Sequence, residues 1–148
     1  MIAYLDSSVL LRVILGQSDR LKDWRLIRHG VASRLVEVEC LRTLDRLRLN
    51  ALLSVEELAR RREAVFRLMA ELSLVELTEG VLDRASQPFP TPLGTLDALH
   101  LATALLWKQS RDVDLVMATH DGALATAARA CGMRAVGAAR AHHEEKRK

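Results

Sequence analysis

The chain has 148 residues, a formal net charge of +3 and two cysteines, a length that fits a single domain with its own buried core. Hydrophobic residues make up 49% and charged residues 28%, the balance of a soluble globular protein. No apolar segment approaches the roughly 20 residues that span a bilayer, and no signal-peptide pattern opens the chain. We therefore expect a cytoplasmic protein in which Cys40 and Cys131 are buried free thiols.

Arginine dominates the positive charge. Two successive predicted helices carry clusters of it: Arg42, Arg46 and Arg48 on one, and Arg60, Arg61, Arg62 and Arg67 on the next. Such runs are most often solvated helix faces, and a polyanionic partner is the functional alternative. Aromatic residues make up only 3%, which argues against an RNA-binding platform built on base stacking.

The chain opens with a short apolar run, residues 1–5, which ends at Asp6, Ser7 and Ser8. An apolar run without alternation is typical of a strand buried on both faces of a parallel sheet. Serine is a preferred N-cap, so a helix is expected to begin at Ser7 or Ser8 and to end at Gly16. Asp6 is thus predicted at the carboxyl end of the first strand, where open α/β sheets bind ligands. The alternative is that Asp6 only helps to cap the helix.

Strands and helices alternate along the rest of the chain. The clearest local signal is a capping box of Ser54 and Glu57, and three prolines between residues 88 and 92 predict a stiff loop. The elements expected after the first strand are helices over residues 8–16 and 19–29, a strand over 31–33, helices over 33–50 and 55–72, a strand over 74–77, helices over 78–86 and 96–107, a strand over 114–119, a helix over 123–131 and an edge strand over 135–137.

This alternation predicts a three-layer α/β/α sandwich on a parallel sheet of about five strands. Residues 1–137 are expected to form the single domain, and residues 138–148, which mix charges with little apolar content, a frayed tail.

Several acids share one property: each lies at a predicted strand end or near a helix start, beside apolar sequence. They are Asp6, Asp97, Asp121 and either Glu37 or Glu39. Taken alone, Asp97 and Asp121 are explained by favourable interaction with a helix N-terminus, worth about 0.3–1 kcal/mol. Together the acids converge on one sheet edge, where carboxylates repel one another unless a cation lies among them. The helical periodicity does not decide between Glu37 and Glu39.

Oxygen ligands without His or Cys suit Mg²⁺ or Mn²⁺ rather than zinc. Such a cluster can activate a water and stabilise an in-line displacement at phosphorus. Without metal, repulsion within the cluster is expected to raise the pKa of at least one carboxyl group. An acidic metal site combined with an arginine-rich surface indicates a nuclease.

Four stretches carry a resemblance to a known family. They are YLDSS at residues 4–8, SRLVEVECLR at 33–42, TLDALHLATA at 95–104 and ATHD at 118–121. In this order they resemble PIN-domain ribonucleases, and specifically the VapC toxins of bacterial toxin–antitoxin pairs. The resemblance spans residues 1–137.

The resemblance selects Glu39 over Glu37 and implies that Asp6, Glu39, Asp97 and Asp121 bind the metal and carry out catalysis. It also implies that Ser8 and Thr119 support the acids or a water. His100 matches a common residue of the family, and on physical grounds we expect it to pack against the base of its helix. A basic residue that often follows the last acid in the family is replaced by Gly122.

The family further implies a homodimer built from the apolar faces of the first helices and the helical hairpin. A small VapB-like antitoxin would cover the acidic groove, and the substrate would be structured RNA, either tRNA or rRNA.

Two other functions fit the sequence less well. A phosphotransferase with Asp6 as nucleophile lacks a second Asp two residues on, where Ser8 stands, and no Lys follows a late strand. A regulatory RNA-binding module with this fold but no chemistry is disfavoured by the intact acids.

Overall fold

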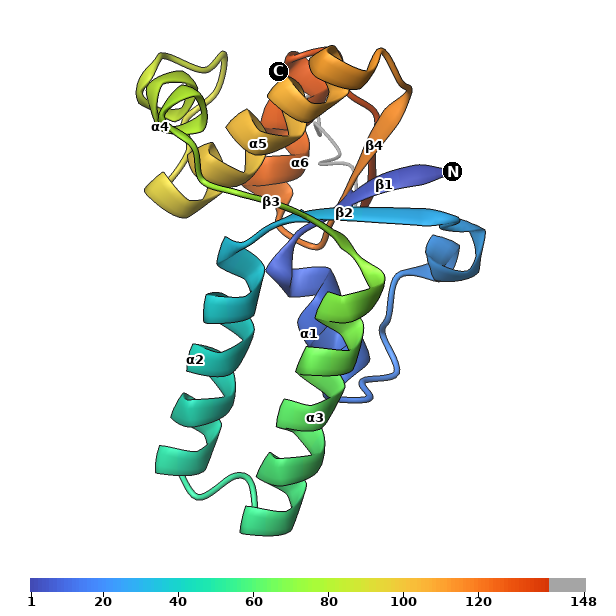
Figure 1. Cartoon of the computed structure of the whole chain (residues 1–148), viewed down its shortest axis with the longest axis vertical. Helices are drawn as coiled ribbons and strands as arrows, with labels where there is room; N and C mark the ends of the chain where they lie inside the picture. The colour runs from blue at the N-terminus through green and yellow to red at the C-terminus, as the bar shows by residue number, and fades with distance from the viewer. Residues whose placement is uncertain (139–148) are drawn as a thin grey trace, which may run out of the picture.

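The computed structural model describes residues 1–138 and contains one sheet of five parallel strands in the order β3-β2-β1-β4-β5 (Figure 1). The strands are β1 (Ile2–Leu5), β2 (His29–Ser33), β3 (Ser73–Val75), β4 (Leu115–Thr119) and β5 (Ala135–Gly137). The expected parallel sheet of about five strands is therefore confirmed.

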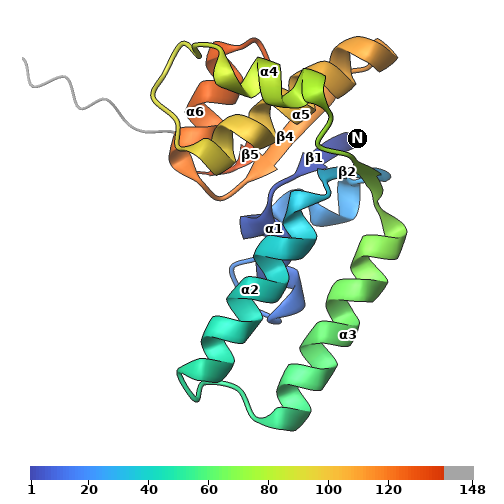
Figure 2. The same ribbon diagram turned by 60° about the vertical axis from the view of Figure 1, so that its left-hand side comes forward.

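Helices cover both faces of this sheet (Figures 1 and 2). One face carries α1 (Ser7–Ile14), α2 (Leu35–Leu49) and α3 (Val55–Glu71), while α5 (Thr95–Arg111) and α6 (Gly122–Ala130) cover the other and α4 (Glu79–Ser86) packs against α5. Two separate buried apolar clusters lie between the helices and the sheet, one on each face. The three-layer α/β/α sandwich is confirmed.

The central strand β1 contributes to both apolar clusters, which explains why its sequence does not alternate between apolar and polar residues. Ala3 and Leu5 point into the cluster under α1, and Tyr4 points into the cluster under α5. All three side chains are at most 1% exposed. A strand buried on both faces has no polar positions to offer solvent.

The predicted capping box begins α3 as expected. The Ser54 hydroxyl accepts a hydrogen bond of 3.1 Å from the Glu57 amide, and the Glu57 carboxylate accepts one of 3.0 Å from the Ser54 amide. The helices α2 and α3 then form a helical hairpin that extends beyond the sheet (Figures 1 and 2).

The helix predicted over residues 19–29 is wrong. Only a short 3₁₀ helix forms there, at Lys22–Leu26, because Leu21 is the one apolar side chain of the segment that becomes fully buried. Trp24 and Ile27 pack against the core only partly buried, so a helix in this segment would have little of the packed apolar face that stabilises most protein helices. Gly30, which follows the predicted helix, lies in β2, where a Cβ would come within 2.5 Å of the Leu72 side chain.

Several boundaries and caps differ from the prediction. The N-cap of α1 is Asp6, not a serine, and the N-cap of α5 is Gly94, so Thr95 is already helical. Helix α5 also continues past residue 107 to Arg111, and Cys131 is half-buried where full burial was expected.

Among residues 1–138 no helix is both long enough and apolar enough to cross a membrane. The tail expected over residues 138–148 lies, apart from Ala138, outside the described residues.

Candidate active site

The site lies at the point of the sheet where the strand order reverses: β2 and β3 lie on one side of β1, and β4 and β5 lie on the other. The strands β1 and β4 are neighbours, with Leu5 opposite Ala118. Helix α1, which follows β1, packs on one face, whereas α6, which follows β4, packs on the other. Such a switch point opens a crevice at the carboxyl ends of the two strands, where ligands bind in open α/β sheets. Asp6 directly follows β1, and Asp121 lies two residues after β4.

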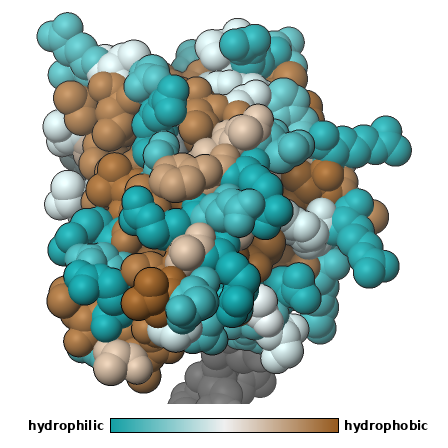
Figure 3. Space-filling model, turned by 60° about the horizontal axis from the view of Figure 1, so that its bottom comes forward, coloured by the Kyte–Doolittle hydropathy of each residue, from teal (hydrophilic) through white to brown (hydrophobic). Residues whose placement is uncertain are grey.

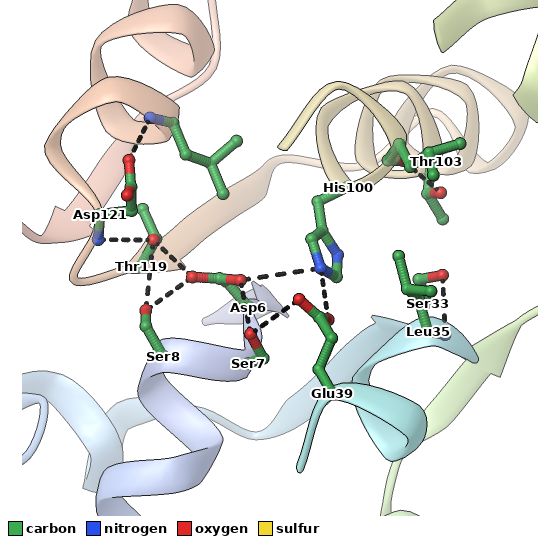
Figure 4. A network of polar contacts seen from close by, with 12 residues as sticks. Asp6, Ser7, Ser8, Ser33, Leu35, Glu39, His100, Thr103, Thr119 and Asp121 are labelled. Atoms are coloured by element: carbon green, nitrogen blue, oxygen red, sulfur yellow. Dashed lines mark hydrogen bonds and ion pairs between the residues drawn. The ribbon is translucent and has the colours of Figure 1, made fainter. Parts of the chain in front are cut away.

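Asp6 forms the base of the site and is held by three hydroxyls (Figure 4). Its Oδ2 accepts hydrogen bonds from Ser8 Oγ at 2.6 Å and from Thr119 Oγ1 at 2.8 Å, and its Oδ1 accepts a weaker one from Ser7 Oγ at 3.4 Å. Asp6 is only 4% exposed. A buried carboxylate needs such donors to replace water.

The same hydroxyls fix the turn between β4 and α6. Thr119 Oγ1 accepts a hydrogen bond of 2.9 Å from the Asp121 amide, and Ser8 Oγ accepts one of 2.9 Å from the His120 amide. The two hydroxyls therefore couple Asp6 to the backbone that carries Asp121.

Glu39 reaches the site from α2, and its two carboxylate oxygens have different partners (Figure 4). Ser7 Oγ donates a hydrogen bond of 3.2 Å to Oε1, and His100 Nε2 lies 2.8 Å from Oε2. His100 Nε2 also lies 3.8 Å from Asp6 Oδ1. Burial lowers the pKa of His100, but the hydrogen bond and the negative charge of Glu39, together with the other acids, outweigh it and raise the pKa overall.

Asp97 and Asp121 complete the acidic set. Asp97 lies in the first turn of α5 and is half-buried, and Asp121 is the N-cap of α6, where its Oδ1 accepts a hydrogen bond of 2.8 Å from the Leu124 amide. Burial, followed by the negative charges of Asp121 and Asp6, raises the pKa of Asp97. These charges act on Asp97 because the acids face a shared space.

That space is an open hollow to which all four acids contribute. It is lined by Asp6, Ser7, Ser8, Glu39, Gly94, Thr95, Leu96, Asp97 and Asp121. Glu37 is not among the lining residues, although it lies only two positions from Glu39 on the same helix. The structure thus brings together the four acids expected from the sequence, with Ser8 and Thr119 beside Asp6.

The donor chemistry of the hollow fits a hard divalent cation. Four carboxylates supply only oxygen ligands, which suits Mg²⁺ or Mn²⁺. The pKa of Asp97 is raised first by burial and then by the negative charges of Asp121 and Asp6, and a cation in the hollow would offset that repulsion. As their side chains stand, no three Asp, Glu, His or Cys residues of the described chain lie close enough together to hold one ion. Glu39 is turned toward His100, and Asp121 toward its own helix.

Two residues of the site were not anticipated as part of it. Ser7 bridges Asp6 and Glu39, whereas the sequence indicated only a helix start there. His100 is buried, as expected from packing, but it also contacts Glu39, and its Nδ1 lies 2.9 Å from the Tyr4 hydroxyl. The sequence did contain a signal for His100: it follows Asp97 by three positions, which places both side chains on the same side of α5.

A family model described as the PIN domain matches residues 3–130. Ribonuclease VapC46 of Mycobacterium tuberculosis is 38% identical to this chain over 134 residues, which cover 88% of this chain and 92% of that protein.

Solved structures share the fold at low sequence identity. A toxin–antitoxin complex from Klebsiella pneumoniae matches with a TM-score of 0.59 and 14% identity, covering 82% of this chain and 87% of that one. VapBC2 from Rickettsia felis, bound to a DNA fragment from its promoter, matches with a TM-score of 0.64 and 11% identity, covering 91% and 97%. PAE2754 from Pyrobaculum aerophilum matches with a TM-score of 0.56 and 18% identity, covering 91% and 88%.

Proposed function

This chain belongs to the PIN-domain family, and we propose that it is a metal-dependent endoribonuclease acting as the toxin of a VapC-type toxin–antitoxin pair. The observation that carries the proposal is the convergence of Asp6, Glu39, Asp97 and Asp121 on one hollow at the β1/β4 switch point. The ribonuclease that is 38% identical over most of the chain supports the same activity.

In this proposal Asp6 and Asp97, with Glu39 or Asp121, hold Mg²⁺ or Mn²⁺, and the remaining acid orients the attacking water. When bound, such an ion supplies positive charge at the scissile phosphate and lowers the pKa of a water. Asp6 is suited to a fixed role because Ser8 and Thr119 already hold it in place. Asp121 is exposed and so is accessible to solvent and substrate.

The substrate class is structured RNA, with tRNA or rRNA as the specific expectation. Helix α2 offers a basic surface that would bind the RNA phosphate backbone beside the hollow. Arg42 and Arg46 follow Glu39 at i+3 and i+7, on the same side of the helix. Both arginines are exposed. Arginine contacts to phosphate supply affinity that does not depend on sequence.

The proposed protein partners are a second copy of this chain and a VapB-like antitoxin, both in the cytoplasm. Val13, Ile14, Ala64 and Leu68 line a groove between α1 and α3 that also includes Arg67. Figure 3, with the α2–α3 end of the molecule turned forward, shows apolar surface interrupted by hydrophilic side chains. A surface of this mixed kind suits a protein interface with an apolar centre and a polar rim.

The test is to incubate purified, antitoxin-free protein with total RNA from the source organism, with and without Mg²⁺ or Mn²⁺, and to map new 5′ ends by sequencing. The Asp97→Asn variant is assayed in parallel. We expect one or a few discrete ends that require metal and are absent with the variant.

RNA binding without metal-dependent ends would contradict the nuclease and indicate a non-catalytic RNA-binding module. Phosphorylation of Asp6 by an acyl phosphate would indicate a phosphotransferase instead.

A further inference from the structure

A chain of buried hydrogen bonds runs from the second strand through the core to the acidic hollow. The Ser33 amide donates to the Tyr4 hydroxyl at 3.2 Å, the Tyr4 hydroxyl lies 2.9 Å from His100 Nδ1, and His100 Nε2 lies 2.8 Å from Glu39 Oε2. Tyr4 and His100 are fully buried. Figure 4 shows the end of this chain, where His100 points from α5 toward Glu39 on α2.

In the neutral state of His100, every donor of this chain meets an acceptor when the Tyr4 hydroxyl donates to Nδ1 and Nε2 donates to Glu39. The Ser33 amide can only donate, so the Tyr4 oxygen accepts from it and the hydroxyl proton is available for His100 Nδ1. An imidazole that accepts at Nδ1 carries its proton on Nε2, the atom that faces the Glu39 carboxylate.

The contact to Glu39 does not depend on the charge of the imidazole. If Nδ1 also carries a proton, the Tyr4 hydroxyl accepts that proton's hydrogen bond, because a hydroxyl can play either part. In both states the Nε2 proton points at Glu39. The same nitrogen lies 3.8 Å from Asp6, so it stands between two of the acids.

The ring itself is held firmly. Tyr4 and His100 meet edge to face, with ring centroids 5.9 Å apart and planes at 69°. A buried ring nitrogen without a partner is costly, so the core holds the imidazole in the orientation that satisfies both of its nitrogens. Glu39, by contrast, is on a long, flexible side chain that is 17% exposed at the rim of the hollow.

We propose that His100 is a positioning residue that holds Glu39 toward the acidic hollow, and that Tyr4 anchors His100 from the core. The inference rests on the proposed function, since Glu39 matters here as one of the acids that hold the ion. Groups that support a metal ligand typically change metal affinity or activity about 10–100-fold when they are removed.

The test uses the full-length chain with three variants and one control. His100→Leu removes both hydrogen bonds, His100→Gln keeps a donor that can reach Glu39, and Tyr4→Phe removes only the anchoring hydroxyl. Met117→Leu is the matched control, because Met117 lies opposite Tyr4 in the sheet and shares its apolar cluster but has no part in the hydrogen-bonded chain.

The first measurement is Mn²⁺ affinity by calorimetry, with thermal unfolding in EDTA recorded for each variant. We expect His100→Leu to bind Mn²⁺ about 10–100-fold more weakly than the wild type. His100→Gln should recover most of the affinity, and Tyr4→Phe should fall between them. Met117→Leu should bind Mn²⁺ like the wild type even where it lowers the melting temperature. Equal Mn²⁺ affinity in His100→Leu and the wild type, or a His100→Gln variant as weak as His100→Leu, would overturn the inference.

The second measurement requires neither metal nor activity. In metal-free protein labelled with ¹⁵N-histidine, the His100 Nε2 resonance should be that of a protonated nitrogen and should shift in Glu39→Gln. An unprotonated Nε2 would overturn the inference even if the wild type binds metal and cuts RNA. A wild-type chain that binds no Mn²⁺ would instead contradict the proposed function, and the nitrogen spectra would decide separately whether His100 holds Glu39.

Discussion

The Thr119 hydroxyl donates a hydrogen bond of 2.8 Å to the carboxylate of Asp6, which lies 113 positions earlier in the chain. The same hydroxyl accepts a bond of 2.9 Å from the Asp121 amide. One buried oxygen thus connects two of the four acids across the β1/β4 switch point, and it is available because the sheet register sets Leu5 opposite Ala118.

Thr119→Val should destabilise the protein while keeping the shape of the side chain. The change leaves the Asp121 amide without its acceptor and Asp6 without one donor, and we expect the free energy of unfolding to fall by about 1–3 kcal/mol. Urea titration measures this loss, and RNA cleavage should fall with it. Thr126→Val is the control, because the Thr126 hydroxyl is exposed and bonds only within its own helix. Equal stability in the two variants would show that the Thr119 bridge contributes little.

Asp97→Asn should abolish cleavage and, without metal, leave the protein as stable as the wild type or more stable. Burial and the charges of Asp121 and Asp6 raise the pKa of Asp97, so the ionised carboxylate destabilises the folded chain at any pH above that raised pKa. The wild type therefore gains stability as pH falls through this pKa, and the variant lacks that gain.

Melting temperatures measured in EDTA from pH 8 to pH 4 test the direction of this pH dependence. The advantage of Asp97→Asn should be largest at pH 8 and should shrink toward the ordinary Asp pKa of about 3.9. A large drop in melting temperature at pH 8 would instead assign Asp97 a structural role.

Glu39→Gln and Glu37→Gln form a matched pair on one helix. Only Glu39 lines the hollow, so Glu39→Gln should reduce cleavage by more than the roughly 10–100-fold typical of a residue that only supports a ligand. Glu37→Gln should cut RNA like the wild type. Rates on the RNA identified by end mapping give the comparison, and the reverse order would remove Glu39 from the catalytic set.

Divalent metal should stabilise the folded chain. An ion at 100 times its dissociation constant contributes about 2.7 kcal/mol to the free energy of unfolding. Adding Mn²⁺ to protein treated with EDTA should therefore raise the melting temperature, and Asp6→Asn should show a much smaller increase. An increase of the same size in both proteins would mean that the ion binds elsewhere.

Ser54→Ala tests whether the start of α3 is separate from the chemistry. Losing the capping box should lower the free energy of unfolding by about 1 kcal/mol, measured by urea titration. Cleavage below the unfolding transition should be unchanged, because Ser54 is at the start of α3 and does not line the hollow. A loss of cleavage would indicate that α3 takes part in RNA binding.

The sequence by itself determined the features that depend on neighbouring residues. The capping box of Ser54 and Glu57 acts across three positions, and the unbroken apolar run that ends at Asp6 identified a strand buried on both faces. These signals are reliable because their physical cause lies within the segment itself. In the capping box a backbone amide needs an acceptor, and in the first strand every side chain is apolar because neither face of the strand contacts solvent.

Only the tertiary structure decided which distant groups meet. Residues 19–29 have helical spacing, yet Leu21 is the only apolar side chain of that segment that is fully buried. Trp24 and Ile27 pack against the core only partly buried, so a longer helix would have little buried surface to stabilise it. His100 looked like a packing residue until the fold placed its two nitrogens between Tyr4 and Glu39. Such contacts depend on strand order and on which surfaces are buried together, and these are properties of the whole chain that no local pattern of residues contains.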